Sequence, residues 1–294
     1  MYYFENIDNV SVLQRVPSFH SNTFDDGNNA GFDSGTMLID QVLAHYTDCL
    51  LNNEVALRYL AHRGITDVNI IREFRLGFSD RSLGLSLKRL ESQQEEATRG
   101  KLQLVGLLKP SGHEFFHGSV VFPFIDEDGK VTGGYGRRIT HKLRSPSVYH
   151  IHWNSNQAVF FNQKALIGTK SIILCKTPLE ALSYWVIGFR NVVSTLGLRQ
   201  FNEHHIFALQ QYGVEEVLVA FDNDREGNSA ARLVSQALSA FDIGCRRIRY
   251  PKESDANDCL MFNRQSQRYF EGLVKKSKTC KQGFSSIKKD CSNE

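Results

Sequence analysis

Residues 216–241 read EVLVAFDNDREGNSAARLVSQALSAF, and their pattern indicates the class of the fold. Its first six residues are mostly apolar, which is typical of a buried strand over 216–221. The polar run DNDREG interrupts the pattern, and from Asn228 to Phe241 apolar residues return at the spacing of one helix face. That face comprises Ala230, Leu233, Val234, Ala237, Leu238 and Phe241. The stretch therefore predicts a strand, a polar turn and a helix, in that order.

The same unit recurs on both sides of this stretch. The segment SIILC is a short apolar run, and Pro178 after it suits the first turn of a helix. Because strands and helices alternate with short connections, we expect a parallel sheet flanked by helices, an α/β domain over 169–262. Its further predicted strands cover 171–175, 192–195 and 246–250, and its further helices cover 178–186 and 201–212.

A mixed α+β subdomain is predicted upstream, over residues 38–168. Apolar residues at helical spacing fill its beginning and stop at Gly64. The segment SVVFPFIDEDGKVTGGYGRRI, at 119–139, predicts a β-hairpin because Asp128-Gly129 is a strong turn signal between two strand-like runs.

Both ends of the chain differ from these two subdomains. Residues 1–37 are rich in Asn, Asp, Ser and Gly and are predicted to form a disordered leader. Residues 263–294 carry many lysines in a Ser-rich background and are predicted to form a basic tail. Such a tail is either a solvated end or a non-specific contact for phosphates.

Composition excludes several classes of protein. The chain has 294 residues, of which 41% are hydrophobic and 23% charged, so it is neither disordered overall nor collagen-like nor a coiled coil. No apolar run of about 18 residues predicts a membrane span, and MYYFENIDNV lacks the pattern of a signal peptide. We therefore expect a cytoplasmic protein without a membrane partner. The six cysteines form no CxxC pair, so no structural zinc site is expected.

Acidic residues follow the predicted strands of the α/β domain. Asp222 and Asp224 come directly after one strand, Glu180 lies in the first turn of a helix, and Asp255 follows the last strand. Because ligands of parallel sheets bind at the carboxyl ends of the strands, these side chains are expected to share one edge. Carboxylates suit Mg²⁺ or Mn²⁺, although any one of them alone could be a helix cap instead.

Three motifs resemble the DnaG-type primases and the toprim domain that they share with topoisomerases and some nucleases. AFDNDREGNSAARLV resembles the toprim acidic motif, and ALRYLAHRGITDVNIIREFRLGF and GHEFFHGSVVFPFIDEDGKVTGGYGRRI resemble the upstream half of the primase catalytic core. The resemblance covers about residues 38–262. Judging from GYGRRI, VFFNQKAL and ILCxxxxEAL, it is closest to primase-like toprim proteins of mobile elements.

This resemblance implies a function and a set of site residues. It implies synthesis of short RNA primers from ribonucleoside triphosphates on single-stranded DNA, with Mg²⁺ or Mn²⁺ as the cofactor. The subdomain at 38–168 would bind template and nucleotide, and a replicative helicase or a separate zinc-domain protein is a further expected partner. The implied metal ligands are Glu180, Asp222, Asp224 and Asp255, and the implied nucleotide or template contacts are Arg137, Arg138, Lys142, Arg72 and Arg75.

One departure from the family stands at the site itself. The family has a Glu directly after the first strand of the toprim domain, and this chain has Lys176 there. Glu180 matches the second acidic position, and an i,i+4 contact between the two is allowed. Two alternatives to a primase therefore stay open: a catalytically weakened protein that binds single-stranded DNA or a replication partner, and a toprim nuclease that uses the same metal edge.

Overall fold

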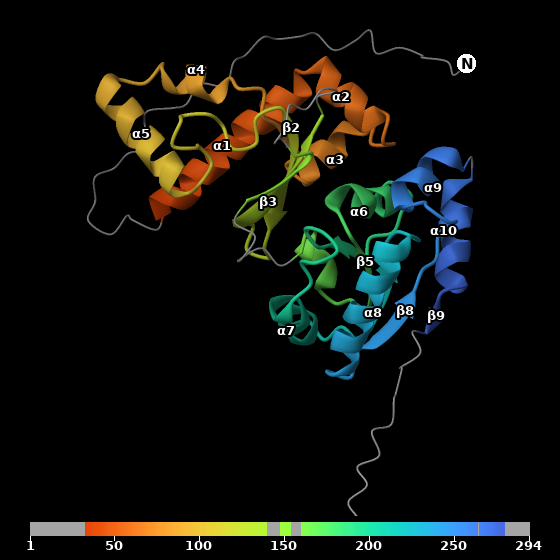
Figure 1. Cartoon of the computed structure of the whole chain (residues 1–294). Coiled ribbons are helices and arrows are strands. Elements are labelled where there is room, and N and C mark those ends of the chain that lie inside the picture. The colour runs from red at the N-terminus through yellow and green to blue at the C-terminus, as the bar shows by residue number, and fades with distance from the viewer. Residues whose placement is uncertain (1–32, 140–147, 154–159, 264, 280–294) are drawn as a thin grey trace, which may run out of the picture. The chain divides into compact units, whose positions relative to one another are not determined.

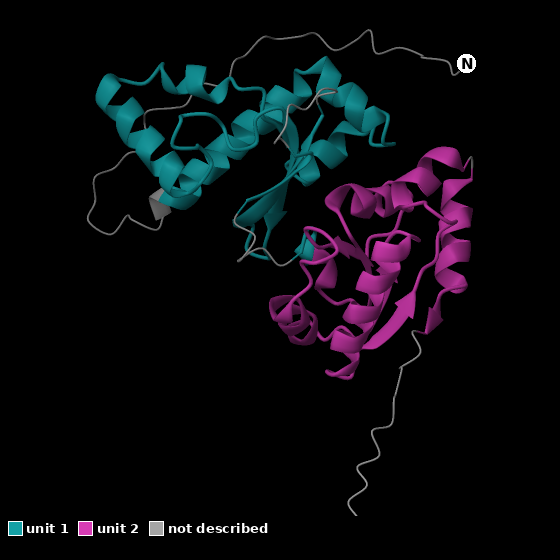
Figure 2. Ribbon diagram, viewed as in Figure 1, with its two compact units in different colours: residues 1–163 teal, residues 164–294 magenta. Residues whose placement is uncertain are grey.

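The computed structural model describes residues 33–139, 148–153, 160–263 and 265–279. The chain divides into two compact units, residues 1–163 and residues 164–294 (Figure 2). Each unit has its own sheet and its own core, so each is described by itself.

The first unit combines helices with an antiparallel sheet whose strand order is β1-β2-β3-β4 (Figure 1). The hairpin predicted over 119–139 is confirmed as β2 and β3, with Gly129 at φ 83° in the turn between them. The elements are α1 (Asp33–Leu51), α2 (Glu54–Ala61), α3 (Val68–Glu73), β1 (Gly77–Phe78), α4 (Leu83–Leu87), α5 (Ser92–Leu104), β2 (Ser119–Ile125), β3 (Val131–Arg138) and β4 (His150–Trp153).

Helix α1 packs on this sheet and supplies much of the core. Tyr46 of α1 is fully buried, as is Phe116, which lies in the same hydrophobic cluster. Trp153 of β4 closes the cluster, and its indole Nε1 donates a hydrogen bond to the carbonyl oxygen of Val105 at 2.8 Å. Satisfying the indole N–H allows a large aromatic side chain to be buried here.

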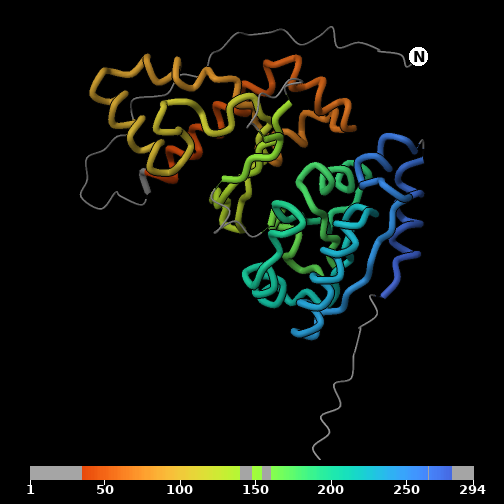
Figure 3. Tube along the Cα trace, viewed as in Figure 1, coloured from red at the N-terminus to blue at the C-terminus, as the bar shows by residue number. Residues whose placement is uncertain are grey.

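The second unit is the predicted α/β domain. Its strand order is β6-β5-β7-β8-β9; the first four strands are parallel, and β9 pairs antiparallel with β8. Figure 3 traces the alternation of strand and helix along the backbone. After a short 3-10 helix (Gln163–Leu166), the elements are β5 (Ser171–Cys175), α6 (Pro178–Trp185), β6 (Val192–Ser194), α7 (Glu203–Gln211), β7 (Glu216–Ala220), α8 (Arg225–Ser239), β8 (Gly244–Arg247), α9 (Ala256–Phe262), α10 (Ser266–Lys275) and β9 (Lys278–Thr279).

The strands and caps of this unit follow from their sequences. Residues 171–175 and 216–220 are buried along most of their length because neighbouring strands and helices cover both faces. Helix α8 begins at the polar turn, where the Asp224 side chain accepts a hydrogen bond from the Gly227 N–H at 2.6 Å. The polar run DNDREG thus ends the strand and caps the next helix.

Both predicted terminal segments need correction. Helix α1 begins at Asp33, so residues 33–37 are helical rather than part of a disordered leader, because they form the turn that precedes the buried Leu38 in the same helix. Within the predicted basic tail, residues 266–275 form α10 and residues 278–279 form β9. Phe270 of α10 is fully buried and packs edge-on against Tyr184, with ring centroids 4.8 Å apart. The many lysines of this segment made it look solvated as a whole, so its composition did not predict a buried Phe270.

Among the described residues, no helix is both long enough and apolar enough to cross a membrane.

A glycine sets how closely α1 approaches the sheet. At Gly77 in β1, an added Cβ would lie 2.6 Å from the Tyr46 Cβ, whereas nothing lies within 4 Å of a Cβ added at Gly100 in α5. Gly77→Ala should therefore lower the free energy of unfolding by about 1–3 kcal/mol through overpacking. Gly100→Ala should raise it by about 0.5–1 kcal/mol through helix propensity. Urea unfolding of both variants checks this, and equal effects would contradict the close packing of α1 on β1.

Candidate functional site

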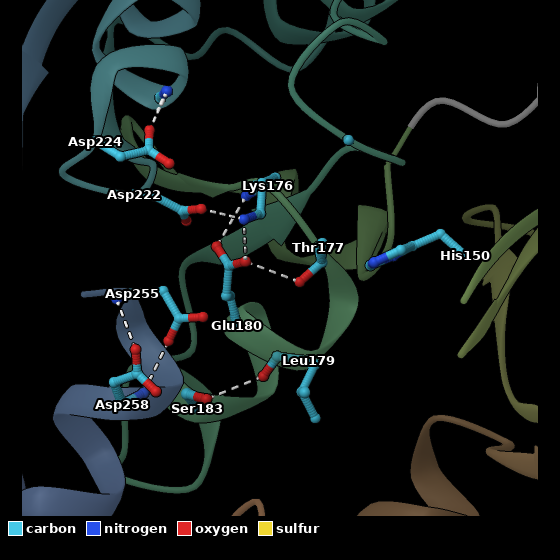
Figure 4. A network of polar contacts seen from close by, with 12 residues as sticks. His150, Lys176, Thr177, Leu179, Glu180, Ser183, Asp222, Asp224, Asp255 and Asp258 are labelled. Carbon is cyan, nitrogen blue, oxygen red and sulfur yellow. Dashed lines mark hydrogen bonds and ion pairs between the residues drawn. The ribbon is translucent and has the colours of Figure 1, made fainter. Parts of the chain in front are cut away.

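Three carboxyl groups meet at the carboxyl end of the parallel sheet. Asp222 follows β7, Glu180 lies in the first turn of α6, and Asp255 is the N-cap residue of α9. One oxygen atom from each lies within 4.8 Å of the other two, and Figure 4 shows the three groups turned toward one another. The sheet therefore brings together residues that are far apart in the sequence, as its topology requires.

These carboxyl groups are largely withdrawn from solvent. The Glu180 side chain is 4% exposed and the Asp222 side chain 19% exposed. The Oδ1 atom of Asp222 is buried and accepts no hydrogen bond from the described residues. A buried carboxylate oxygen without a donor is costly unless a cation lies against it.

Lys176 supplies one positive charge within this group. It directly follows β5, and its ammonium group forms an ion pair with Asp222 Oδ2 and lies 3.6 Å from Glu180 Oε1 (Figure 4). Thr177 adds a hydrogen bond from its hydroxyl to Glu180 Oε1 at 3.0 Å. The Lys176 N–H donates to the other oxygen of that carboxyl group at 3.4 Å. Glu180 is thus held by the turn that links β5 to α6.

Burial and mutual repulsion change the acidity of the site. Burial raises the pKa of Glu180 to about 8; the Lys176 ammonium opposes this rise, and the nearby Asp222 and Asp255 carboxylates reinforce it. Burial also raises the pKa of Asp255. For Lys176, burial alone would lower the pKa, but Glu180 and Asp222 outweigh it and raise the pKa above its ordinary value. The lysine is therefore charged across the whole physiological range of pH.

The arrangement fits one divalent cation. When Glu180, Asp222 and Asp255 are all ionised, three negative charges and the positive charge of Lys176 sum to minus two, which one divalent ion neutralises. The buried, unpartnered Asp222 Oδ1 is a ready oxygen ligand of the kind that Mg²⁺ and Mn²⁺ prefer. A second ion would have to share the space beside Asp222 and Glu180 with the lysine ammonium.

Asp224, the fourth predicted ligand, lies outside the converging group. Its side chain caps α8 through the Gly227 N–H, as described above. The structure thus brings together three of the four predicted carboxylates and adds Lys176 to them.

Several residues that sequence reasoning missed hold the site in place. Arg247 of β8 donates hydrogen bonds to the carbonyl oxygens of Val219 and Asp222, at 3.1 and 2.8 Å, and so fixes the turn after β7. Asp255 and Asp258 form a capping box at the start of α9. The D-x-x-D spacing could have revealed that box, whereas nothing in the local sequence points to Arg247.

The predicted basic residues do not form one group in the first unit. Arg137 and Arg138 are adjacent on β3, so their side chains leave opposite faces of the strand. Arg137 Nη1 lies 2.6 Å from His150 Nε2, and its guanidinium covers the Tyr149 ring at 5.4 Å from the centroid. Arg138 is buried, 8% exposed, with Nη2 3.4 Å from His117 Nε2.

The other predicted contacts differ in their surroundings. Arg72 is exposed in the last turn of α3. Arg75 forms an ion pair with Asp40 at 2.7 Å. Some of the N–H donors of its guanidinium are therefore already used. Lys142 lies outside the described residues.

Each of the two units matches a model of a known protein family. The family model described as "DNA primase catalytic core, N-terminal domain" matches residues 45–169, and the model described as "Toprim-like" matches residues 173–260. The DNA primase of Campylobacter jejuni is 28% identical over 229 residues, which cover 72% of this chain and 35% of that protein. Over both units the chain is therefore similar to DNA primases. The DNA primase of Aquifex aeolicus is similar to it too, 26% identical over 252 residues that cover 81% of this chain and 50% of the relative.

Solved primase structures share the fold of this chain. The Aquifex aeolicus primase, in a structure of its zinc-binding and RNA polymerase domains, superposes with a TM-score of 0.72 at 22% identity and covers 85% of this chain and 62% of that one. A DnaG primase catalytic domain bound to single-stranded DNA gives a TM-score of 0.66 at 20% identity, with 84% and 82% covered. The chain spans 35% and 50% of the length of the two curated relatives above.

The raised pKa of Glu180 has a consequence for stability. Between the ordinary value of 4.5 and about 8, Glu180 of the folded chain keeps a proton that the unfolded chain has lost. The free energy of unfolding should therefore be largest below pH 4.5, as far as this group contributes, and fall as the pH rises toward 8.

Urea unfolding across this range, with a chelator present, checks the prediction. Glu180→Gln should flatten the fall. Glu216→Gln is the matched control. Arg246 lowers the pKa of Glu216, so the contribution of Glu216 to the free energy of unfolding is lost only as the pH falls below its ordinary pKa. If the slope between pH 4.5 and 8 is the same in Glu180→Gln as in the parent, the burial of an ionisable Glu180 is not what sets it.

Lys176 should stabilise the fold as a built-in counter-ion. Lys176→Met leaves the carboxylates without their cation and should cost about 3 kcal/mol in chelator, as when one partner of a buried pair is removed. Mg²⁺ should restore much of this loss because it supplies the missing positive charge. Lys170→Met is the control: that lysine is 69% exposed in its pair with Glu215, so about 0.5 kcal/mol is expected. Thermal unfolding with and without Mg²⁺ measures both, and equal losses would refute the role.

Proposed function

We propose that this chain is a DNA primase that makes short RNA primers on single-stranded DNA by nucleotidyl transfer. The observation that carries the proposal is the convergence of Glu180, Asp222 and Asp255 at one edge of a toprim-like sheet, in a chain that also has the N-terminal domain of the primase catalytic core. The relatives named DNA primase support the same reading.

In this proposal Glu180, Asp222 and Asp255 hold one Mg²⁺ or Mn²⁺ ion. Such an ion stabilises charge on the reacting phosphates when it is bound. Lys176 reduces the repulsion between the Glu180 and Asp222 carboxylates and presents a fixed positive charge next to them. Thr177 and Arg247 are positioning residues, because they hold Glu180 and the turn that carries Asp222. Asp224 acts mainly as the cap of α8.

Template and nucleotide binding are assigned to the first unit. Arg137 presents a guanidinium beside Tyr149 and His150, a combination of charge and aromatic rings that suits phosphates and unstacked bases. Arg72, exposed on α3, is a second candidate phosphate contact. Arg138 is buried and is better placed to support β3 than to meet a ligand. Arg75 and Lys142 stay as predicted contacts.

The remaining partners follow from the resemblance to primases. Single-stranded DNA and ribonucleoside triphosphates are the proposed substrates, and a replicative helicase or a separate zinc-domain protein is a proposed partner. Zinc-binding and RNA polymerase domains occur together in the solved Aquifex aeolicus primase, and this motivates the proposal of a zinc-domain partner. A cytoplasmic location and a role in a mobile element complete the proposal.

One observation favours a second candidate, a binding protein with weakened catalysis. The Lys176 ammonium lies against Asp222, at the position where the resemblance implies a glutamate. Such a protein would hold single-stranded DNA without extending a primer. No observation in this chain favours the third alternative, a nuclease.

Primer synthesis on single-stranded DNA with labelled ribonucleotides separates these functions. With Mg²⁺ or Mn²⁺ the parent chain should incorporate label, and Asp222→Ala should lower the rate about 100-fold or more. Glu203→Ala, an acidic residue in the first turn of α7, is the control and should retain the rate. The proposed assignment fails if Asp222→Ala incorporates as well as the parent.

Two further outcomes identify the alternatives. Salt-sensitive DNA binding without incorporation by the parent, together with activity in Lys176→Glu, supports the binding protein. Release of labelled nucleotides from DNA supports the nuclease.

A further inference from the structure

A second group of potential metal ligands lies in the first unit, apart from the acidic edge. His45 and Cys49 are four residues apart on α1 and therefore lie on the same face of that helix. Asp80 follows β1 in the segment that leads to α4. One ligand atom from each of the three residues lies within 4.8 Å of the other two.

The spacing of the His45 and Cys49 ligand atoms matches a zinc centre. His45 Nε2 and Cys49 Sγ are 3.5 Å apart. In a tetrahedral zinc site, a nitrogen at about 2.0–2.1 Å and a sulfur at about 2.3 Å from the ion are separated by about 3.5 Å. The pair therefore already has the separation that a shared ion requires, without a change in the course of α1.

The three ligand residues differ in their exposure to solvent, and the exposed one leaves a path by which a metal ion could enter. His45 is buried, 2% exposed, Cys49 is half-buried and Asp80 is exposed. The group is thus closed on the helix side and open at Asp80. An ion bound here would have its fourth position toward water.

Ser82 shows how the group is organised around a shared centre. Its Oγ lies 3.0 Å from His45 Nε2 and 3.4 Å from Cys49 Sγ. The Ser82 N–H donates to Asp80 Oδ1 at 2.9 Å, which holds the Asp80 side chain beside the other two. Four polar side chains from two segments, residues 45–49 and 80–82, are therefore linked through the Ser82 hydroxyl and backbone N–H.

We propose that His45, Cys49 and Asp80 bind one zinc ion that fastens α1 to the segment after β1. An imidazole, a thiolate and a carboxylate form a ligand set of the kind that zinc uses. On binding, the Cys49 thiol gives its proton to solvent as its sulfur takes up the ion, and the Ser82 hydroxyl yields its place between the ligands. The absence of CxxC pairs predicted no structural zinc, but His-x-x-x-Cys on one helix offers two zinc ligands without such a pair.

Cobalt substitution tests the site directly. Chelator-treated protein is titrated with Co²⁺ in excess Mg²⁺, and then with Zn²⁺ as competitor. One equivalent of Co²⁺ should produce the near-ultraviolet absorption of a thiolate-to-cobalt bond, and Zn²⁺ should remove it. Cys49→Ser should abolish this absorption. Cys245→Ala, which removes a buried cysteine of the second unit, should leave it unchanged.

Asp80→Asn is a second variant of the site, needed in case Cys49→Ser fails to fold. Asp80 is exposed, so this substitution should not disturb the core. It should fold with an unfolding midpoint near that of the parent in chelator, and it should weaken Co²⁺ binding about tenfold or more. Zn²⁺ should raise the unfolding midpoint of the parent and of Cys245→Ala, but not that of Cys49→Ser.

Three outcomes would overturn the zinc site. These are Co²⁺ binding without a thiolate absorption, an absorption that persists in Cys49→Ser, and affinity that is the same in Asp80→Asn. In each case the group would be only a set of hydrogen bonds that joins α1 to Ser82.

Discussion

Three carboxyl groups at the end of one parallel sheet repel one another unless protons or cations neutralise them. Glu180 is buried, Asp222 has a buried oxygen without a donor among the described residues, and Asp255 lies within reach of both. Parallel strands place their carboxyl ends at one edge, so the topology itself creates this concentration of charge. The caps of α8 and α9 and the Arg247 hydrogen bonds fix the turns so that the charges cannot separate.

Lys176 decides how that charge is balanced. Its ammonium pairs with Asp222 and approaches Glu180, so part of the neutralisation comes from the chain itself. The remaining charge matches one divalent ion. In the proposed primase, the acidic edge would therefore bind one ion. The Lys176 ammonium would supply the positive charge that a second ion could otherwise supply. The same lysine would also permit the edge to stay folded when no metal is bound.

Local patterns predicted much of the fold. The apolar runs at 171–175 and 216–220 and the Asp128-Gly129 turn specify their elements without help from distant residues. The convergence of Glu180, Asp222 and Asp255 was also predictable, because it follows from strand ends in a parallel sheet.

Contacts between distant residues explain what the sequence did not reveal. Helix α10 depends on Phe270 packing against Tyr184, which the surrounding lysines conceal. Asp224 could equally have been a ligand or a cap, and only the loop geometry assigns it to Gly227. His45, Cys49 and Asp80 meet because α1 packs beside β1, and no local spacing joins residue 80 to residues 45 and 49.

The most direct test of the acidic edge is a crystal structure of the chain soaked in Mn²⁺, with anomalous diffraction data collected to locate the ion. We expect one anomalous peak in the second unit, bonded to oxygens of Glu180, Asp222 and Asp255, with the Lys176 ammonium still beside Asp222. Two manganese ions at this edge, or carboxyl groups that turn away from one another with no ion between them, would rule out the single-ion site.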